Sequence, residues 1–140
     1  MLSVFFVYDI RYMTYLFLLG RVLFGGFFMM SSLGHFMKTK DMAGYAASKK
    51  IPMPKFSVLA SGLLLFLGGL WIVLGTLIIV GAVELLLFLV PAAFLMHDFW
   101  NVTDPQMKMT QQLMFMRNIA LIGAVLMMLE IPSPWPFAAF

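Results

Sequence analysis

Residues 56–96, FSVLASGLLLFLGGLWIVLGTLIIVGAVELLLFLVPAAFLM, decide the fold of this chain, and Glu84 is the only charged residue among them. The stretch is about twice as long as the roughly 20 residues that a helix needs to cross the hydrocarbon core of a bilayer. Gly75 and Thr76 lie near its middle, where a glycine is typical of a turn. We therefore predict two membrane-spanning helices, over residues 56–74 and 77–96, joined by a tight turn.

Apolar stretches on either side of this pair supply two further spans, over residues 12–36 and 113–129. The composition agrees, because 63% of the 140 residues are hydrophobic and only 11% are charged, whereas a soluble domain carries about 25% charged residues. Lipid offers no hydrogen-bond partners, so each span must satisfy its own backbone as a helix. The predicted fold is an all-α, integral membrane four-transmembrane-helix bundle, forming one domain over residues 1–140.

The polar segments between the spans predict the orientation. Residues 37–55 hold five lysines and end in two prolines that prevent a continuous helix, with room for a short interfacial helix over residues 41–48. Residues 97–112 form a second polar loop with Lys108, whereas Arg11 stands alone on the side of the termini. The positive-inside rule then places both loops in the cytoplasm and both termini on the opposite side. Trp135, in a proline-broken tail, is expected to anchor at the membrane interface.

The composition also excludes several kinds of chemistry. The chain has no cysteine, which removes disulfides, thiol nucleophiles and iron–sulfur ligands. Its 14 methionines are scattered through apolar helices, where packing is a commoner role than copper binding, and we predict no metal site. The net charge of +3 comes mostly from the 37–55 loop and does not indicate a nucleic-acid surface. No phosphate-binding loop or Ser/His/Asp arrangement occurs, so we do not expect catalysis by this chain alone.

Two charged residues lie inside the predicted spans, Arg21 in the first and Glu84 in the third. Charges in the bilayer interior are costly and are usually paired or functional. Counted from the terminal-side ends of their helices, both lie about 10–12 Å deep in the same half of the membrane. We predict an intramembrane ion pair between them, acting either as a packing lock or as part of a proton or ligand site.

A cluster of polar residues is expected at the cytoplasmic ends of the helices, where antiparallel spans meet. The candidate ligand-binding residues are His35, Lys38, His97, Asp98, Trp100, Gln111, Arg117 and Asn118. Such a cationic, aromatic-rimmed niche could hold a quinone carbonyl or a lipid phosphate, and it could equally be an ordinary polar collar. Bis-histidine haem ligation is disfavoured, because both histidines lie at helix ends rather than in the apolar core.

Two segments of the sequence point to a protein family more specifically than the hydropathy pattern does. Residues 94–100 read FLMHDFW and residues 115–123 read FMRNIALIG, and together they resemble the DoxX family of small four-helix membrane proteins. Arg21, Gly25, Lys38, the proline hinge at 51–54 and the paired glycines at 68–69 fit the same pattern, over about residues 15–128. The chain departs from the family where many relatives carry a glutamate before the paired glycines, since it has Leu64 and Leu65 there.

The resemblance implies a protein of the prokaryotic cytoplasmic (inner) membrane. Some members of the family are subunits of thiosulfate:quinone oxidoreductase, others are partners of soluble redox proteins, and the wider group is similar to Surfeit-locus cargo receptors. The leading hypothesis is a membrane subunit of a quinone-linked redox assembly, with a redox protein as partner. The alternatives are a non-enzymatic scaffold or cargo- or lipid-binding protein and, less favoured, a small-solute transporter. A homo-oligomer with contacts through Ala120 and Ala124 stays open.

Overall fold

The structure is a computed structural model that describes the backbone of residues 2–140 and the side chains of residues 11–140. Its helices are α1 (Leu2–Met37), α2 (Thr39–Ser48), α3 (Pro54–Leu74), α4 (Ile78–Pro91) and α5 (Pro105–Leu129). A π-helical turn, η1 (Ala92–Met96), continues α4, and a 3₁₀ turn, η2 (Phe99–Asn101), precedes α5. Within the described part of the chain, four segments, 11–37, 54–74, 78–101 and 105–129, are long and apolar enough to cross a membrane. The predicted all-α, four-span membrane fold is confirmed.

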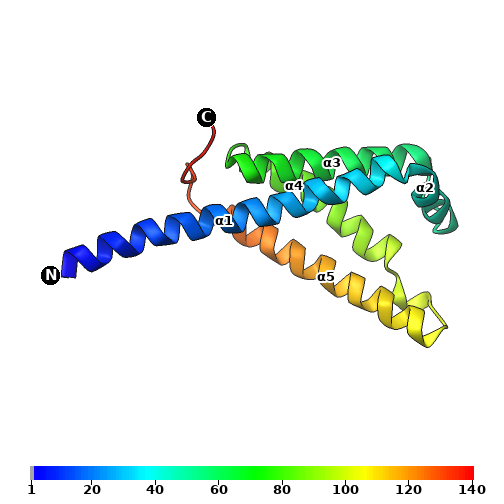
Figure 1. Cartoon of the computed structure of the whole chain (residues 1–140). Helices are drawn as coiled ribbons and strands as arrows, with labels where there is room; N and C mark the ends of the chain where they lie inside the picture. The colour runs from blue at the N-terminus through cyan, green and yellow to red at the C-terminus, as the bar shows by residue number, and fades with distance from the viewer. Residues whose placement is uncertain (1) are drawn as a thin grey trace.

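The helices form an open arrangement in which α1 packs on α3, α3 on α4, and α4 on α5. Figure 1 shows that α1 and α3 run side by side, whereas η1 and α5 diverge from them toward the end that carries α2. Pro91 explains the divergence of α4, because proline has no backbone N–H to donate and its ring disturbs the preceding turn. The π-helical turn follows it directly. The bundle is therefore tight at the Gly75 turn and open at the α2 end.

Glycines permit the closest helix contacts. A Cβ placed on Gly25 would lie 2.5 Å from the carbonyl oxygen of Gly69, and a Cβ on Gly69 would lie 2.5 Å from that of Gly25. The backbones of α1 and α3 thus touch at this crossing, as small residues allow in membrane bundles. Gly68 has the same role toward α4, where a Cβ would lie 2.8 Å from the Leu85 side chain.

The fourth span begins earlier than the sequence predicted, at Pro105 instead of residue 113. Asp104 is the N-cap, and its side chain accepts a 2.7 Å hydrogen bond from the backbone N–H of Met107. A capping aspartate followed by proline at the first helical position is a strong helix start. Polar residues assigned to a loop, Gln111 among them, therefore belong to α5.

The C-terminal tail folds back onto the bundle at the Gly75 end. Trp135 is only 2% exposed and packs edge-to-face on Phe17, with ring centroids 5.0 Å apart. The N–H of Ala139 donates a 3.0 Å hydrogen bond to the carbonyl of Leu74 at the end of α3. The expectation of an interfacial Trp135 is wrong, because this indole belongs to the hydrophobic core.

Candidate functional site

Arg21 lies beside the last turn of α3 and is buried, with 3% exposure. Its guanidinium donates hydrogen bonds to the carbonyls of Val73 at 3.2 Å, Pro136 at 2.7 Å and Phe137 at 2.8 Å. The carbonyl end of a helix carries partial negative charge, which favours a cation there. Arg21 therefore fixes the tail to the end of α3.

The predicted ion pair between Arg21 and Glu84 is wrong, because neither residue forms an ion pair with any of residues 11–140. Counting residues along a helix fixes the height of a side chain but not its direction around the axis. Nothing in the sequence indicated that backbone carbonyls of the tail would accept the hydrogen bonds of the Arg21 guanidinium. Glu84 keeps one buried carboxylate oxygen, Oε2, without a hydrogen-bond partner among these residues.

Polar residues of the predicted niche form an outer cluster that ties α2 to the loop before α5. His97 Nδ1 lies 2.8 Å from Gln111 Oε1, and Gln111 Nε2 donates a 3.4 Å hydrogen bond to the Tyr45 hydroxyl. Tyr45 in turn donates to the Met96 carbonyl at 3.0 Å. These side chains satisfy one another, which is the behaviour of a structural collar.

An ion pair between Lys49 and Asp98 belongs to the same outer cluster. Asp98 also accepts a 3.0 Å hydrogen bond from the Asn101 amide. The hydrogen bond from Lys49 to the Asp98 carboxylate raises the pKa of the lysine, because it stabilises the charged ammonium. The pair holds α2 against the end of the third span.

Three other residues of the predicted niche face a small cavity of about 120 Å³ instead. His35, Arg117 and Asn118 line it together with Ser31, and the rest of its wall is apolar. Asn118 is 3% exposed, yet its amide makes no hydrogen bond to any of residues 11–140. Arg117 is exposed and has no ion-pair partner among the same residues. The small cavity is therefore a place where hydrogen-bonding groups remain available.

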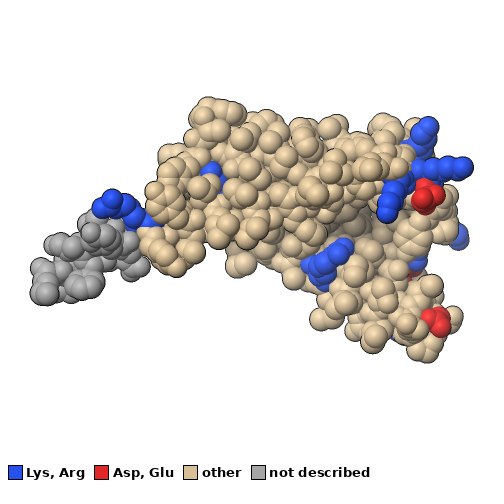
Figure 2. All heavy atoms as spheres, in the orientation of Figure 1, with Lys and Arg blue, Asp and Glu red and all other residues tan. Residues whose placement is uncertain are grey.

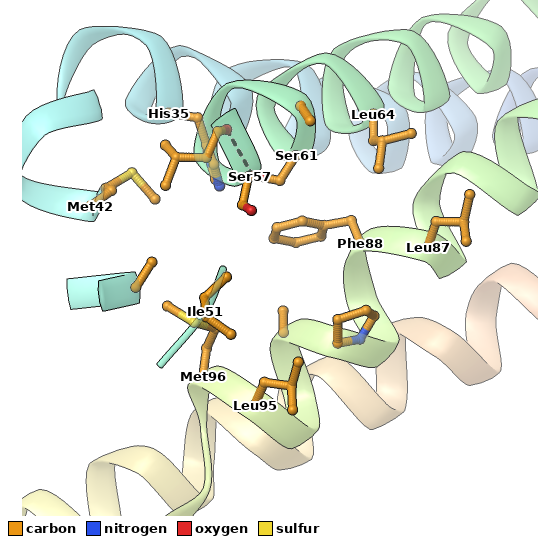
Figure 3. Close-up of a pocket in the computed structure, with 15 residues that line it drawn as sticks. His35, Met42, Ile51, Ser57, Ser61, Leu64, Leu87, Phe88, Leu95 and Met96 are labelled. Carbon is orange, nitrogen blue, oxygen red and sulfur yellow. Dashed lines mark hydrogen bonds between the residues drawn. The ribbon is translucent and has the colours of Figure 1, made fainter. Parts of the chain in front are cut away.

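A larger cavity of about 280 Å³ adjoins the first, since His35 and Phe88 line both. It lies where η1 diverges from α3, and side chains from α1, α2, α3, α4 and η1 line it, as Figure 3 shows. Its walls are mostly apolar, with residues such as Leu64, Leu87 and Leu95. The pair of cavities thus joins a larger, mostly apolar space to a smaller one that has a few polar groups in its wall.

His35 is the polar group between the two cavities. Its Nδ1 lies 3.2 Å from the Ser31 carbonyl oxygen, which can only accept, so Nδ1 carries the hydrogen of this bond. The neutral ring then offers Nε2 as an acceptor, and no residue among 11–140 occupies it. Phe88 packs edge-to-face on the ring at 5.6 Å and fixes its orientation. Figure 3 shows the ring directed toward the large cavity.

The predicted niche therefore divides into two sets. His35, Arg117 and Asn118 belong to the cavities, whereas His97, Asp98 and Gln111 form the outer cluster. The two remaining candidates join neither set: Trp100 packs edge-to-face on Phe99 and Phe115, and Lys38 is exposed before α2.

Sequence reasoning missed Ser31, Tyr45 and Phe88. Ser31 could have been found, because it lies one helical turn before His35 and so on the same face. Phe88 carried no signal in a span that is apolar throughout.

An open bundle of four apolar helices, with a cavity between them at the level of His35, defines an integral membrane protein in contact with the lipid bilayer. Residues 16–98, more than half of the chain, match the model of the DoxX family. The chain belongs to the DoxX family. The match covers most of α1 and all of α2–α4, and it ends before α5, which supplies Arg117 and Asn118. No curated protein and no solved structure matches the chain.

Proposed function

We propose that this protein is the membrane subunit of a redox assembly and that it binds a quinone in the paired cavities. A protein partner that carries the redox centre supplies the electrons. The observation that carries the proposal is the pair of unpartnered groups, His35 Nε2 and the Asn118 amide, at the border of an otherwise apolar space. Ligand sites are typically apolar pockets with a few such polar groups.

The two cavities match the two parts of a quinone. The Asn118 amide and the Arg117 guanidinium are donors, which suits the carbonyl oxygen of a quinone ring. His35 Nε2 is an acceptor, which suits the hydroxyl of the corresponding quinol. The larger cavity is lined mostly by aliphatic and aromatic side chains and fits an apolar tail.

The charge distribution supports a docking face for the redox partner. Figure 2 shows lysine and arginine side chains gathered at the α2 end of the molecule, beside the hollow between the diverging helices. Lys38, Lys40, Lys50 and Lys55 are exposed in this region. We place this end in the cytoplasm of a prokaryotic cell, since basic loops favour the cytoplasmic side. An acidic face on the partner complements it.

The experiment is a quinone-binding measurement on the purified protein in lipid nanodiscs. Bound quinones are extracted and identified by mass spectrometry, and decylubiquinone is titrated into the delipidated protein. His35→Leu and Asn118→Leu should each weaken binding roughly three- to tenfold, because each loses one hydrogen bond to the ligand. His97→Leu is the matched control, since His97 bonds to Gln111 and lines neither cavity.

Three outcomes decide the proposal. Co-purified quinone with weaker binding in the two cavity variants supports it. Equal affinity in all three variants contradicts it. Phospholipid or a protein cargo in place of quinone would favour a lipid- or cargo-binding scaffold.

A further inference from the structure

Glu84 is the one acidic residue of α4, and the quinone site described above does not use it. The residue is partly buried, its Oε2 is shielded, and no residue among 11–140 bonds to that oxygen. A carboxylate in a bilayer is costly without a partner, so the surroundings favour the neutral carboxylic acid. A neutral acid carries a proton that it can give to a neighbouring acceptor.

The position of Glu84 relates it to the larger cavity. Leu87, Phe88 and Pro91 line that cavity, and they follow Glu84 by three, four and seven residues. Residues with this spacing share one face of a helix. Glu84 therefore lies on the cavity-lining face of α4, one turn or about 5.4 Å nearer to the Gly75 turn. Figure 3 shows Leu87 and Phe88 on the stretch of α4 that borders the cavity.

A second unpartnered oxygen lies on the far side of Glu84. Thr76 Oγ1, in the turn between α3 and α4, is the other buried side-chain oxygen of residues 11–140 that lacks a hydrogen bond. Buried polar groups of this kind are commonly satisfied by internal water. Thr76 and Glu84 thus supply polar groups between the terminal-side surface and the deep end of the cavity.

We propose that Glu84 is a proton-exchange site one helical turn beyond the larger cavity, serving the ligand held beside His35. The inference rests on the proposed function for the identity of that ligand. Reduction of a quinone to a quinol takes up two electrons, which the redox partner supplies, and two protons. Glu84 loses one proton and becomes a carboxylate, and that proton reaches the ring oxygen beside His35 Nε2, at the border of the two cavities; water on the open side of the cavity gives the other proton. Glu84 then regains its proton from water at the terminal-side surface, past Thr76.

The test uses the full chain in nanodiscs and the membrane-permeant reagent dicyclohexylcarbodiimide, which adds to protonated carboxyl groups in apolar surroundings to give a stable N-acylurea. Peptide mass spectrometry locates the adduct. Glu84 should be labelled, and Glu130, which is exposed at the end of α5, should be labelled far less. Glu84→Gln should retain the fold and lose the adduct. Absence of label on Glu84 overturns the proposal.

The connection to the cavity is tested without any quinone. Ala60 lines the larger cavity, so Ala60→Trp fills part of it from α3. Phe56→Trp, at an exposed position of the same helix that lines neither cavity, is the matched control. Labelling of Glu84 should fall severalfold in Ala60→Trp and stay unchanged in Phe56→Trp. Unchanged labelling in Ala60→Trp would mean that the reagent reaches Glu84 from lipid, and it would overturn the connection.

A third measurement separates this inference from the proposed function. Decylubiquinone at saturation should protect Glu84 from the reagent severalfold, and His35→Leu should weaken that protection. If the protein binds no quinone but Glu84 is labelled through the cavity, the proposed function fails and the proton site stands. If quinone binds and labelling does not change, the proton site is the part that fails.

Discussion

Arg21 donates a 2.7 Å hydrogen bond to the carbonyl oxygen of Pro136, although the two residues are 115 positions apart in the sequence. The same guanidinium reaches Val73 at the end of α3, so one buried cation joins α1, α3 and the tail. A charged donor bonded to carbonyls is worth more than a neutral one. This contact holds the bundle together at the end opposite to the cavities.

Arg21→Leu should therefore lower the free energy of unfolding in detergent by about 2 kcal/mol or more, since carbonyls lose a charged donor. Glu84→Gln should change it by less than about 0.5 kcal/mol, because no ion pair is lost. Limited proteolysis should also show the tail released in Arg21→Leu alone. A large coupling free energy between the two substitutions in a double-mutant cycle would indicate an Arg21–Glu84 ion pair and contradict the structure.

The helix crossing at Gly25 and Gly69 gives a second prediction. Gly69→Leu should prevent the close approach of α1 and α3, because its Cβ would meet the Gly25 carbonyl. We expect a much lower thermal stability or loss of the folded protein. Gly26→Ala is the control, since a Cβ there meets nothing within 4 Å, and alanine favours a helix over glycine by about 1 kcal/mol. Equal stability of the two variants would show that the crossing is not close.

The Lys49–Asp98 pair predicts a pH dependence with a definite sign. Because the pKa of Lys49 is raised in the folded protein, the pair stabilises the fold fully below the ordinary lysine pKa of about 10.4. The contribution is lost as pH rises through the higher folded value. Lys49→Met should lower the free energy of unfolding by about 0.2–1 kcal/mol at neutral pH, since both side chains are partly exposed.

The difference between wild type and Lys49→Met should vanish in strong alkali. Lys50→Met is the control, because Lys50 is exposed and has no ion-pair partner among residues 11–140. Thermal unfolding at a series of alkaline pH values provides the measurement. A difference that grows above the ordinary lysine pKa would have the wrong sign for this pair.

The buried position of Asn118 predicts how a substitution there changes the stability of the ligand-free protein. The residue is 3% exposed, but its amide borders the small cavity and bonds to none of residues 11–140, so it adds no hydrogen bond to the stability of the empty protein. Asn118→Leu keeps a similar side-chain volume and should raise the melting temperature of the delipidated protein, corresponding to about 1 kcal/mol. The same substitution should reduce the stabilisation that decylubiquinone provides. A lower melting temperature without ligand would mean that Asn118 is satisfied by groups around it.

The sequence predicted the helices better than it predicted their contacts. The spans follow from hydropathy, and the Gly75 turn from a residue that adopts the positive φ of 71° at the end of α3. The Asp104-Pro105 helix start was visible in the sequence and was overlooked. The position of the tail was not visible, because it depends on backbone carbonyls of Pro136 and Phe137, which every residue type possesses.

The candidate site shows the same limit. The order of the helices places His35 and His97 at the same end of the molecule, yet of these two only His35 lines the two cavities described above. The separation depends on the bend after Pro91, which moves η1 and His97 away from α3. Neither the direction of that bend nor the rotation of α5 follows from periodicity in helices that are apolar on nearly all sides.

The most direct test of the quinone site is a comparison of decylubiquinone affinity in His35→Leu, Asn118→Leu and His97→Leu in nanodiscs. We expect a roughly three- to tenfold loss of affinity in the first two variants and wild-type affinity in the third. Equal affinity in all three, or a loss confined to His97→Leu, would contradict this expectation and would move the site to the outer cluster.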